Sequence, residues 1–261
     1  MSKTVVLMPA YQVGKFWDQV QYSLFNLDPQ PDLFVFCENN SRDETLRKLA
    51  HFKRPHELIS YWLQDDAIKK CETPYDLVAV ARQFLLQRAR HLDPDVALFI
   101  DADIAVKTPG ILESLERWIR MAGMDIVGAP YPRYYPEGLF LGALWYAPKD
   151  RARPGKPFLL MPRPRMIWDP DVAAICGGCM MLSRRILQDR RLNFIPVSRP
   201  HLGVGDVSED YGYCLEAHRL GYRVGLDSSV MLKHWVVNEH LRSKAWRVDK
   251  ELNPMPFSYA S

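Results

Sequence analysis

Short apolar segments alternate with longer amphipathic segments along the first half of the chain. The apolar segments are rich in β-branched and aromatic residues and predict strands at 4–8, 33–37, 58–63, 96–100 and 126–128. The amphipathic segments predict helices at 15–26, 42–51, 75–91 and 109–121. Strands and helices in alternation are typical of βαβ units, so the pattern predicts an α/β fold with a mostly parallel, twisted sheet flanked by helices.

The predicted helix at 42–51 carries its own start signal. Ser41 precedes it, and Glu44 follows Ser41 by three residues, which is the spacing of a capping box. We therefore expect the Ser41 side chain to cap this helix.

The alternation of predicted strands and helices stops in the middle of the chain. Residues 129–172 contain nine prolines and predict a long irregular insertion with a few short elements. Beyond it come an apolar run at 175–182, a helix at 208–220 that ends before Gly221, and a strand at 222–226. We expect one domain over residues 1–235, with the proline-rich insertion on its acceptor side, and a C-terminal extension over 236–261.

Composition narrows the class of protein. Of 261 residues, 48% are hydrophobic and 25% are charged, which excludes a disordered chain, a collagen and a coiled coil. A net charge of +3 does not by itself indicate a nucleic-acid or membrane partner. The longest apolar runs fall short of the ~18–20 residues of a membrane span, and the N-terminal segment resembles a strand more than a signal peptide. With five unevenly spaced cysteines, expected to be reduced, these features predict a cytoplasmic protein without a transmembrane segment.

Polar residues follow the predicted strands that end at Met8, Cys37 and Ile100, and ligands of parallel sheets bind beyond such strand ends. The third of these ends continues as Asp101-Ala102-Asp103. Carboxylates two residues apart on an extended segment point the same way and can share Mg²⁺ or Mn²⁺. Two further Asp-x-Asp triplets, at 93–95 and 169–171, stand in proline turns and are interpreted as solvated turn carboxylates.

Four other motifs have both a structural and a functional interpretation. Glu209 and Asp210 begin a predicted helix, where acidic residues cap and where a general base could be held. His234 could add a nitrogen ligand that suits Mn²⁺. The polar turn at 38–41 could hydrogen-bond a base or ribose. The Cys-Gly-Gly-Cys segment at 176–179 is interpreted as structural, with glycines that let another group approach the backbone closely.

Taken in order along the chain, these motifs resemble those of GT-A glycosyltransferases, most closely the family 2-like group. The resemblance covers residues 4 to about 235 and rests on eight segments. They are Pro9-Ala10-Tyr11, the 38–45 loop, Ala81-Arg82, Asp101-Ala102-Asp103, Gly177-Gly178, Glu209-Asp210, Gly221-Tyr222-Arg223-Val224 and His234. The Gln-x-x-Arg-Trp motif of processive synthases is absent from the sequence.

The resemblance implies a role for each of these residues. Asp210 matches the base that deprotonates the acceptor hydroxyl, with Glu209 beside it. Asp101, Asp103 and His234 match the metal ligands. The residues implied in binding the nucleotide sugar are Pro9, Tyr11, Glu38, Asn40, Arg82, Asp101, Ala102, Gly177 and Gly178.

The resemblance thus implies a metal-dependent enzyme, using Mn²⁺ or Mg²⁺, that moves a sugar from a nucleotide-diphosphate sugar to an acceptor hydroxyl, with inversion and without processivity. A nucleotidyltransferase and a non-catalytic nucleotide-sugar-binding protein are the alternatives. The acceptor is open among a glycan, a protein and modified-base DNA, because basic residues among aromatics in the insertion suit a sugar ring or a flipped-out base equally.

Overall fold

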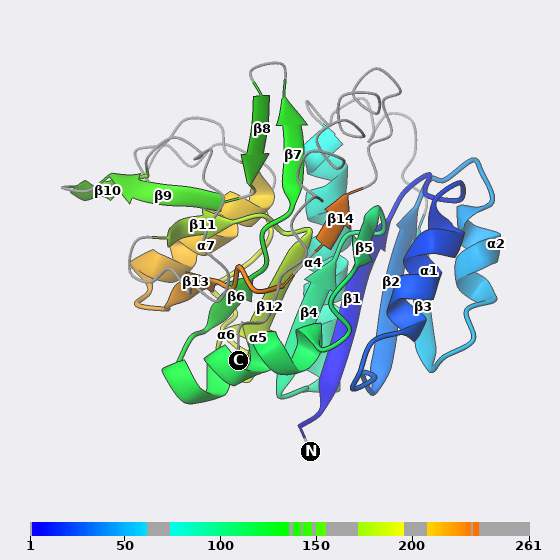
Figure 1. Cartoon of the computed structure of the whole chain (residues 1–261), viewed down its shortest axis with the longest axis horizontal. Helices are drawn as coiled ribbons and strands as arrows, with labels where there is room; N and C mark the ends of the chain where they lie inside the picture. The colour runs from blue at the N-terminus through cyan, green and yellow to red at the C-terminus, as the bar shows by residue number, and fades with distance from the viewer. Residues whose placement is uncertain are drawn as a thin grey trace, which may run out of the picture.

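The computed structural model describes residues 2–61, 74–135, 138–141, 143–147, 150–154, 172–195, 208–230 and 232–234, and for 74–76 and 132–154 the description is of the backbone. Figure 1 shows a central sheet with helices in front of it and behind it, and smaller strand pairs at one end. The predicted C-terminal extension over 236–261 lies outside the described residues.

Seven strands form the central sheet, in the order β13-β6-β12-β4-β1-β2-β3. In chain order they are β1 (Thr4–Ala10), β2 (Leu33–Asn39), β3 (His56–Tyr61), β4 (Val96–Ile100), β6 (Ile126–Gly128), β12 (Cys179–Ser183) and β13 (Val224–Leu226). Strand β1 runs parallel to β2 and β4, β2 to β3, and β6 to β13, whereas β12 is antiparallel to both of its neighbours. The expectation of a mostly parallel sheet is confirmed.

Each face of the sheet buries its own hydrophobic core because alternate side chains of a strand point to opposite faces. Val5 and Leu7 of β1 pack with α4 (Pro74–Leu92), α6 (Arg184–Leu187) and α7 (Glu209–Arg219). Val6 and Met8 pack with α1 (Trp17–Phe25), α2 (Thr45–Ala50) and α5 (Ile111–Ala122). Every residue of β4 is buried, which is why this strand is a continuous apolar run in the sequence.

The insertion contains more regular structure than its nine prolines predict. Strands β7 (Pro132–Tyr135) and β8 (Gly138–Leu141) form an antiparallel pair. Strands β9 (Ala143–Ala147), β10 (Asp150–Pro154) and β11 (Val172–Ile175) form a small sheet in the order β10-β9-β11. Both lie beyond the upper end of the central sheet in Figure 1. Residues 155–171, which include the third Asp-x-Asp triplet, lie outside the described residues.

One further pair of short strands was not predicted from the sequence. Strand β5 (Ile104–Val106) comes directly after the Asp101-Ala102-Asp103 segment and pairs antiparallel with β14 (Leu232–His234). His234 is thereby set opposite Ile104, one residue from Asp103, although more than a hundred residues separate them in the sequence.

The expected capping box is wrong. Helix α2 begins at Thr45 rather than Arg42, and its N-cap residue, Glu44, makes no side-chain capping hydrogen bond. The Asp43 carboxylate accepts from the Thr45 N–H at 3.0 Å. The Ser41 hydroxyl instead accepts a hydrogen bond from the Gln12 backbone N–H, at 3.0 Å.

The ends of the other predicted helices and strands differ from the observed ends by one to two residues, as expected for ends read from periodicity. Gly221, with φ +83°, follows α7 as a helix-ending glycine should. Among the described residues, no helix combines the length and hydropathy that crossing a membrane requires.

Candidate active site

The guanidinium of Arg82 is the centre of the candidate site. Arg82 lies on α4, is only 3% exposed, and its Nη2 atom donates to Oδ1 of Asp101 at 2.6 Å. Its Nη1 atom pairs with Glu209 and lies 3.9 Å from Oδ2 of Asp210. One buried cation thus joins the acidic residue after β4 to the two acidic residues that begin α7. Glu209 is 2% exposed, and a buried carboxylate of this kind is costly unless a cation such as Arg82 is paired with it.

Asp210 is fixed by backbone hydrogen bonds. Its Oδ2 atom accepts from the Gly177 N–H at 2.7 Å, and its Oδ1 atom accepts from the Tyr211 N–H at 2.8 Å and from the Ser208 hydroxyl. Asp210 is in the first turn of α7, where the helix dipole favours a negative charge. Asp210 is 4% exposed, and the position of its carboxylate is set by two separate segments of the chain.

The electrostatics of the site follow from burial and from these contacts. Desolvation raises the pKa of Asp101, and the charge of Arg82 only partly offsets this while that of Asp103 adds to it. Desolvation by itself lowers the pKa of Arg82, but the charges of Asp101 and Asp210 outweigh it and leave that pKa above its usual value. Arg82 therefore stays charged, and Asp101 is the carboxyl in this group that holds a proton more readily than usual.

The two glycines between β11 and β12 each lie against the side chain of another residue, which fills the space where their own side chain would be. A Cβ atom on Gly177 would lie 2.6 Å from Cζ of Arg82, and one on Gly178 would lie 2.6 Å from Cζ of Tyr131. The expectation of a close approach to this backbone is confirmed, and the approaching groups belong to the chain itself. Tyr131 is 2% exposed, and the sequence interpretation placed it among the aromatic residues of the insertion rather than beside these glycines.

Asp103 and His234 lie together beside this cluster. The Nε2 atom of His234 is 3.2 Å from Oδ2 of Asp103, and the two side chains are 18% and 27% exposed, so both reach solvent. A carboxylate oxygen suits Mn²⁺ or Mg²⁺, and an imidazole nitrogen beside it favours Mn²⁺. The buried Nδ1 atom of His234 has no hydrogen-bond partner among the described residues. No group of three or more His, Cys, Asp and Glu side chains within the described ranges is arranged to hold a metal ion. Of the three predicted ligands, two are in contact and Asp101 is held by Arg82.

A cavity of about 210 Å³ opens at the carboxyl ends of β1, β2 and β4. Its lining includes Pro9 and Tyr11 from the first strand end, Asn39 from the second, and the 101–103 segment from the third. The Asn39 side chain is 3% exposed, and its Nδ2 atom makes no hydrogen bond with any described residue. A cavity thus lies at the strand ends that the sequence pointed to, and within the polar turn at 38–41 it is the Asn39 amide that lies in its wall.

Glu38 and Asn40, by contrast, shape the loop. The Glu38 carboxylate accepts from the Ser41 N–H at 2.7 Å and from the Ser60 hydroxyl at 2.9 Å, and Glu38 is 3% exposed. Asn40 has φ +51°, the left-handed conformation that Asn tolerates better than most residues. Glu38 thus bonds its own loop and the neighbouring strand β3, and Asn39 is the member of this segment that lines the cavity.

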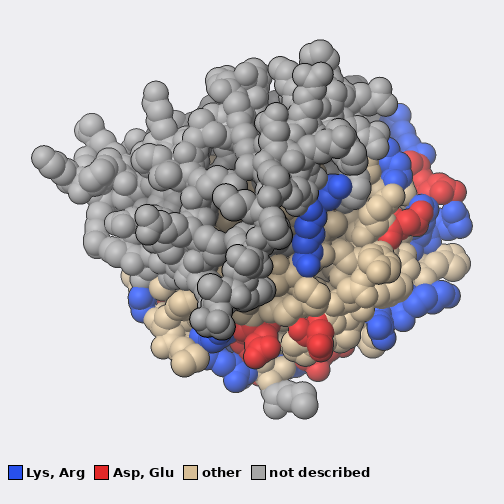
Figure 2. Space-filling model, viewed as in Figure 1, with Lys and Arg blue, Asp and Glu red and all other residues tan. Residues whose placement is uncertain are grey.

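The described residues of the motifs interpreted as structural do not line the cavity. Asp93 pairs with Arg184, and Asp95 accepts from the Lys3 N–H at 2.8 Å. Cys176 and Cys179 are buried free cysteines, and burial raises the pKa of Cys179 to about 12. The contacts of Asp93 and Asp95 agree with surface turn carboxylates, whereas the triplet at 169–171 lies outside the described residues. The described surface in Figure 2 carries basic and acidic side chains interspersed, in keeping with the small net charge.

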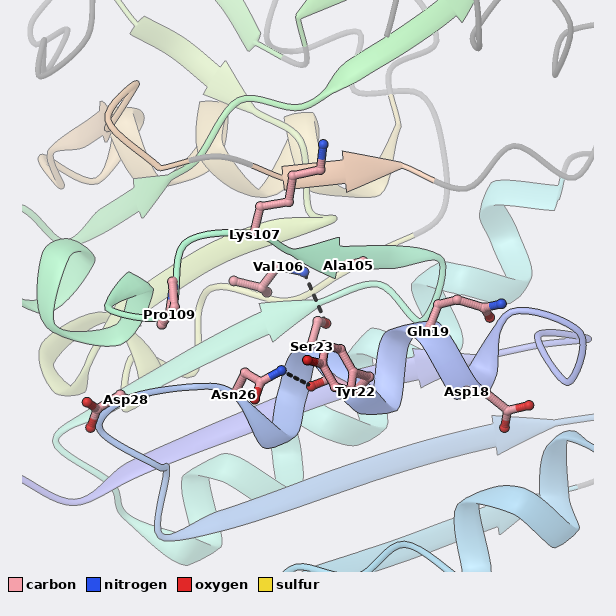
Figure 3. A pocket seen from close by; sticks show the side chains of 10 residues that line it. All are labelled: Asp18, Gln19, Tyr22, Ser23, Asn26, Asp28, Ala105, Val106, Lys107 and Pro109. Carbon is pink, nitrogen blue, oxygen red and sulfur yellow. Dashed lines mark hydrogen bonds between the residues drawn. The ribbon is translucent and has the colours of Figure 1, made fainter. Parts of the chain in front are cut away.

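A wider open cavity, of about 930 Å³, lies between α1 and β5 (Figure 3). Its lining includes Tyr22 and Ser23 of α1, Asn26 directly after that helix, and Lys107 and Pro109. The Ser23 hydroxyl accepts a hydrogen bond from the Val106 N–H, which links α1 to β5 across the cavity. None of the predicted site residues lines this cavity.

A mostly parallel sheet with a strand-end cavity and an acidic motif beside it defines an α/β domain of the GT-A type. The model of the family described as Glycosyl transferase family 2 matches residues 5–191, and the chain belongs to that family of glycosyltransferases. No curated protein sequence matches the chain.

Solved structures agree on the fold. Staphylococcus aureus TarS 1-349 in complex with UDP-GlcNAc is similar at a TM-score of 0.55 and 16% identity, over 92% of this chain and 61% of that one. The mannosyltransferase PcManGT from Pyrobaculum calidifontis, in complex with GDP-Man and Mn²⁺, gives 0.56 and 14%, over 95% and 61%. CMP:2-keto-3-deoxy-manno-octonic acid synthetase complexed with CTP gives 0.53 and 11%, over 96% and 100%. The chain spans less than two thirds of the TarS and PcManGT structures.

Proposed function

We propose that this protein is a metal-dependent, inverting and non-processive glycosyltransferase that uses a nucleotide-diphosphate sugar. The observation that carries the proposal is the contact of Arg82 with both Asp101 and Glu209, beside a cavity at the strand ends. This contact joins the acidic motif suited to the donor with the acidic motif suited to the acceptor. Membership of the family and the nucleotide-sugar complexes of TarS and PcManGT support the same interpretation.

The nucleotide end of the donor fits the 210 Å³ cavity. Its walls are mostly apolar, from Pro9, Val13 and α4, and the unpaired amide of Asn39 can donate to a carbonyl oxygen or ring nitrogen of a base. Tyr11 is 47% exposed at the rim and offers an aromatic face for stacking. Asp101 and Ala102 close the end of the cavity that faces the metal site, where ribose and diphosphate would lie.

Asp103 and His234 would hold the divalent cation, with Asp101 next to them. Such an ion stabilises negative charge on a departing diphosphate by acting as a Lewis acid. The side chains on this chain orient that site: Arg82 fixes Asp101 from one side, and the pairing of β14 with β5 carries His234 to Asp103 from the other. The partial exposure of both Asp103 and His234 leaves them accessible to a ligand.

Asp210 would accept the proton of the acceptor hydroxyl. Each carboxylate oxygen has two lone pairs. Among the described residues, Oδ1 accepts from the Tyr211 N–H and the Ser208 hydroxyl, whereas Oδ2 accepts only from the Gly177 N–H and keeps one lone pair for a hydroxyl. Those bonds hold the carboxylate in one orientation, which is what a general base needs. Glu209 would keep Arg82 in place rather than touch the substrate, because its carboxylate is buried against the guanidinium. A base on the acceptor side fits direct displacement with inversion.

A nucleotidyltransferase is the second candidate, since the CTP-bound synthetase shares the fold over its whole length. A triphosphate substrate favours a glycine-rich, basic loop after the first strand. Here residues 9–15 contain one glycine, and the Gly14 N–H is already bonded to the Asp43 carboxylate at 3.0 Å. A non-catalytic nucleotide-sugar-binding protein would not need Asp210 to be held so rigidly. Both alternatives are therefore less well supported than transfer.

The acceptor is proposed to approach from the side of the insertion, and a glycan, a protein and modified-base DNA remain its candidate classes. Of the basic and aromatic side chains that suggested them, that of Tyr131 is described and is buried, and those at 132–171 lie outside the described side chains. The four described cysteines are free and buried, which supports the proposal of a reducing, cytoplasmic location.

The test is a thermal-shift panel of nucleoside diphosphates and nucleotide sugars with Mn²⁺, Mg²⁺ or EDTA. A ligand that binds only the folded state raises the midpoint of unfolding. We expect one nucleotide to stabilise the wild type only with metal, and Asp103→Ala to abolish the shift. If no nucleotide shifts the midpoint under any metal condition, the proposed donor site is wrong. If CTP or another triphosphate alone does so, the nucleotidyltransferase is favoured.

A further inference from the structure

Tyr131 lies where two parts of the candidate site meet. It follows β6, is 2% exposed, and its ring faces the imidazole of His234 with 5.4 Å between ring centroids and 56° between ring planes. On its other side it fills the space next to Gly178, where a Cβ atom would lie 2.6 Å from Cζ of the tyrosine. The ring is thus enclosed between the β11–β12 turn and His234.

His234 depends on a contact of this kind. Its strand, β14, is three residues long, and pairing with β5 fixes its backbone but leaves the imidazole free to rotate about its side-chain bonds. A metal-bound histidine usually gains its orientation from a hydrogen bond made by its second ring nitrogen. In His234 that nitrogen, Nδ1, is buried and has no such partner among the described residues.

We propose that Tyr131 is a positioning residue for the metal site: its ring holds the imidazole of His234 so that Nε2 faces Asp103. The packing of the two rings takes the place of the hydrogen bond that orients other metal-bound histidines. Gly178 belongs to the same arrangement, because a side chain there would displace the tyrosine ring. This inference rests on the proposed function, since it presupposes a divalent cation between Asp103 and His234.

The experiment uses the full-length, metal-stripped protein and Mn²⁺ alone, with free Mn²⁺ counted by electron paramagnetic resonance. We expect Tyr131→Leu and Gly178→Ala to weaken Mn²⁺ binding by about 10- to 100-fold, the range seen when groups that orient metal ligands are lost. Tyr131→Phe keeps the ring and should stay within about twofold of the wild type. Circular dichroism and thermal unfolding check that each variant is folded. If Tyr131→Leu does not fold, Gly178→Ala, which deletes no group, tests the same displacement of the tyrosine ring.

A double-mutant cycle separates positioning from a general loss of structure. His234→Ala should itself weaken Mn²⁺ binding, and adding Tyr131→Leu to it should have no further effect if the tyrosine acts through the imidazole. A loss that simply adds in the double variant overturns the inference. So does wild-type affinity in Tyr131→Leu. If Asp103→Asn binds Mn²⁺ as the wild type does, the proposed metal site itself is wrong, and the inference falls with it.

Discussion

A Cβ atom on Gly177 would lie 2.6 Å from Cζ and 2.8 Å from Nη1 of Arg82. Real Cβ atoms do not approach other heavy atoms so closely, and the guanidinium has no room to retreat because Asp101 and Glu209 hold it on its other edges. The same glycine donates its backbone N–H to Asp210. Gly177 therefore sets the position of the cation and of the proposed base at once.

Gly177→Ala should for this reason destabilise the fold by about 1–3 kcal/mol, as overpacking of a filled interior does, and reduce sugar transfer more than nucleotide binding. Urea unfolding and donor titration measure the two effects. Gly110→Ala is the matched control, because a Cβ atom there meets only the Asp28 carbonyl, at 3.8 Å. Equal behaviour of the two variants would contradict the close packing of Gly177 on Arg82.

Arg82 and Arg88 allow a comparison of a buried with an exposed ion pair on one helix. Arg82→Gln leaves Glu209 charged, buried and unpaired, and we expect a loss of about 3–5 kcal/mol in the free energy of unfolding. Arg88→Gln breaks a pair with Glu57 whose side chains are 38% and 34% exposed, and should cost about 0–1 kcal/mol. Denaturant titration of both variants measures the difference. Losses of similar size would show that Arg82 is not the central cation we take it to be.

The central sheet could be predicted because most of its strands are buried on both faces. Val96–Ile100 is apolar at every position, and the helices around it are long enough to show a 3.6-residue period. Strands β5 and β14 have three residues each, too few for any periodicity. Strands β7 and β10 were hidden by proline, which stands at the first residue of one (Pro132) and the last of the other (Pro154), positions that a strand tolerates.

The site was predictable in its parts and not in its contacts. Acidic residues at a strand end and at a helix start can be read from local pattern, and paired glycines indicate a close approach. What approaches them is decided by tertiary packing: Arg82 and Glu209 are 127 residues apart in the sequence. Ser41 fails as a cap for a similar reason, because the left-handed Gln12 brings a competing backbone N–H to its hydroxyl.

Asn39 gives a direct test of the nucleotide cavity. Asn39→Leu keeps the side-chain volume close to that of asparagine and removes the amide, so nucleoside diphosphate affinity should fall by about 3- to 10-fold, the equivalent of one hydrogen bond. Ser60→Ala is the control, because that hydroxyl bonds Glu38 and does not line the cavity. Calorimetric titration with the nucleotide found in the thermal-shift panel measures both. An unchanged affinity in Asn39→Leu would place the base elsewhere.

Asp189 should make stability depend on pH in acid. Hydrogen bonds from Arg191 lower its pKa most, and burial, which acts in the opposite direction, is outweighed with the help of the Tyr222 hydroxyl at 2.7 Å. A carboxyl whose pKa is lower in the folded state than in the unfolded chain stabilises the fold above the unfolded value of about 4, and loses that contribution as the pH falls through the folded value.

Asp189→Asn should therefore lower the free energy of unfolding at pH 7, and its deficit against the wild type should shrink when both are measured at pH 3. Urea titration at the two pH values gives that difference directly. Asp18→Asn is the control, because Asp18 is 75% exposed beside Lys48 and a surface pair of this kind contributes little at either pH. A deficit for Asp189→Asn that is as large at pH 3 as at pH 7 would mean that the asparagine disturbs packing around Tyr222, and that the charge of Asp189 does not stabilise the fold.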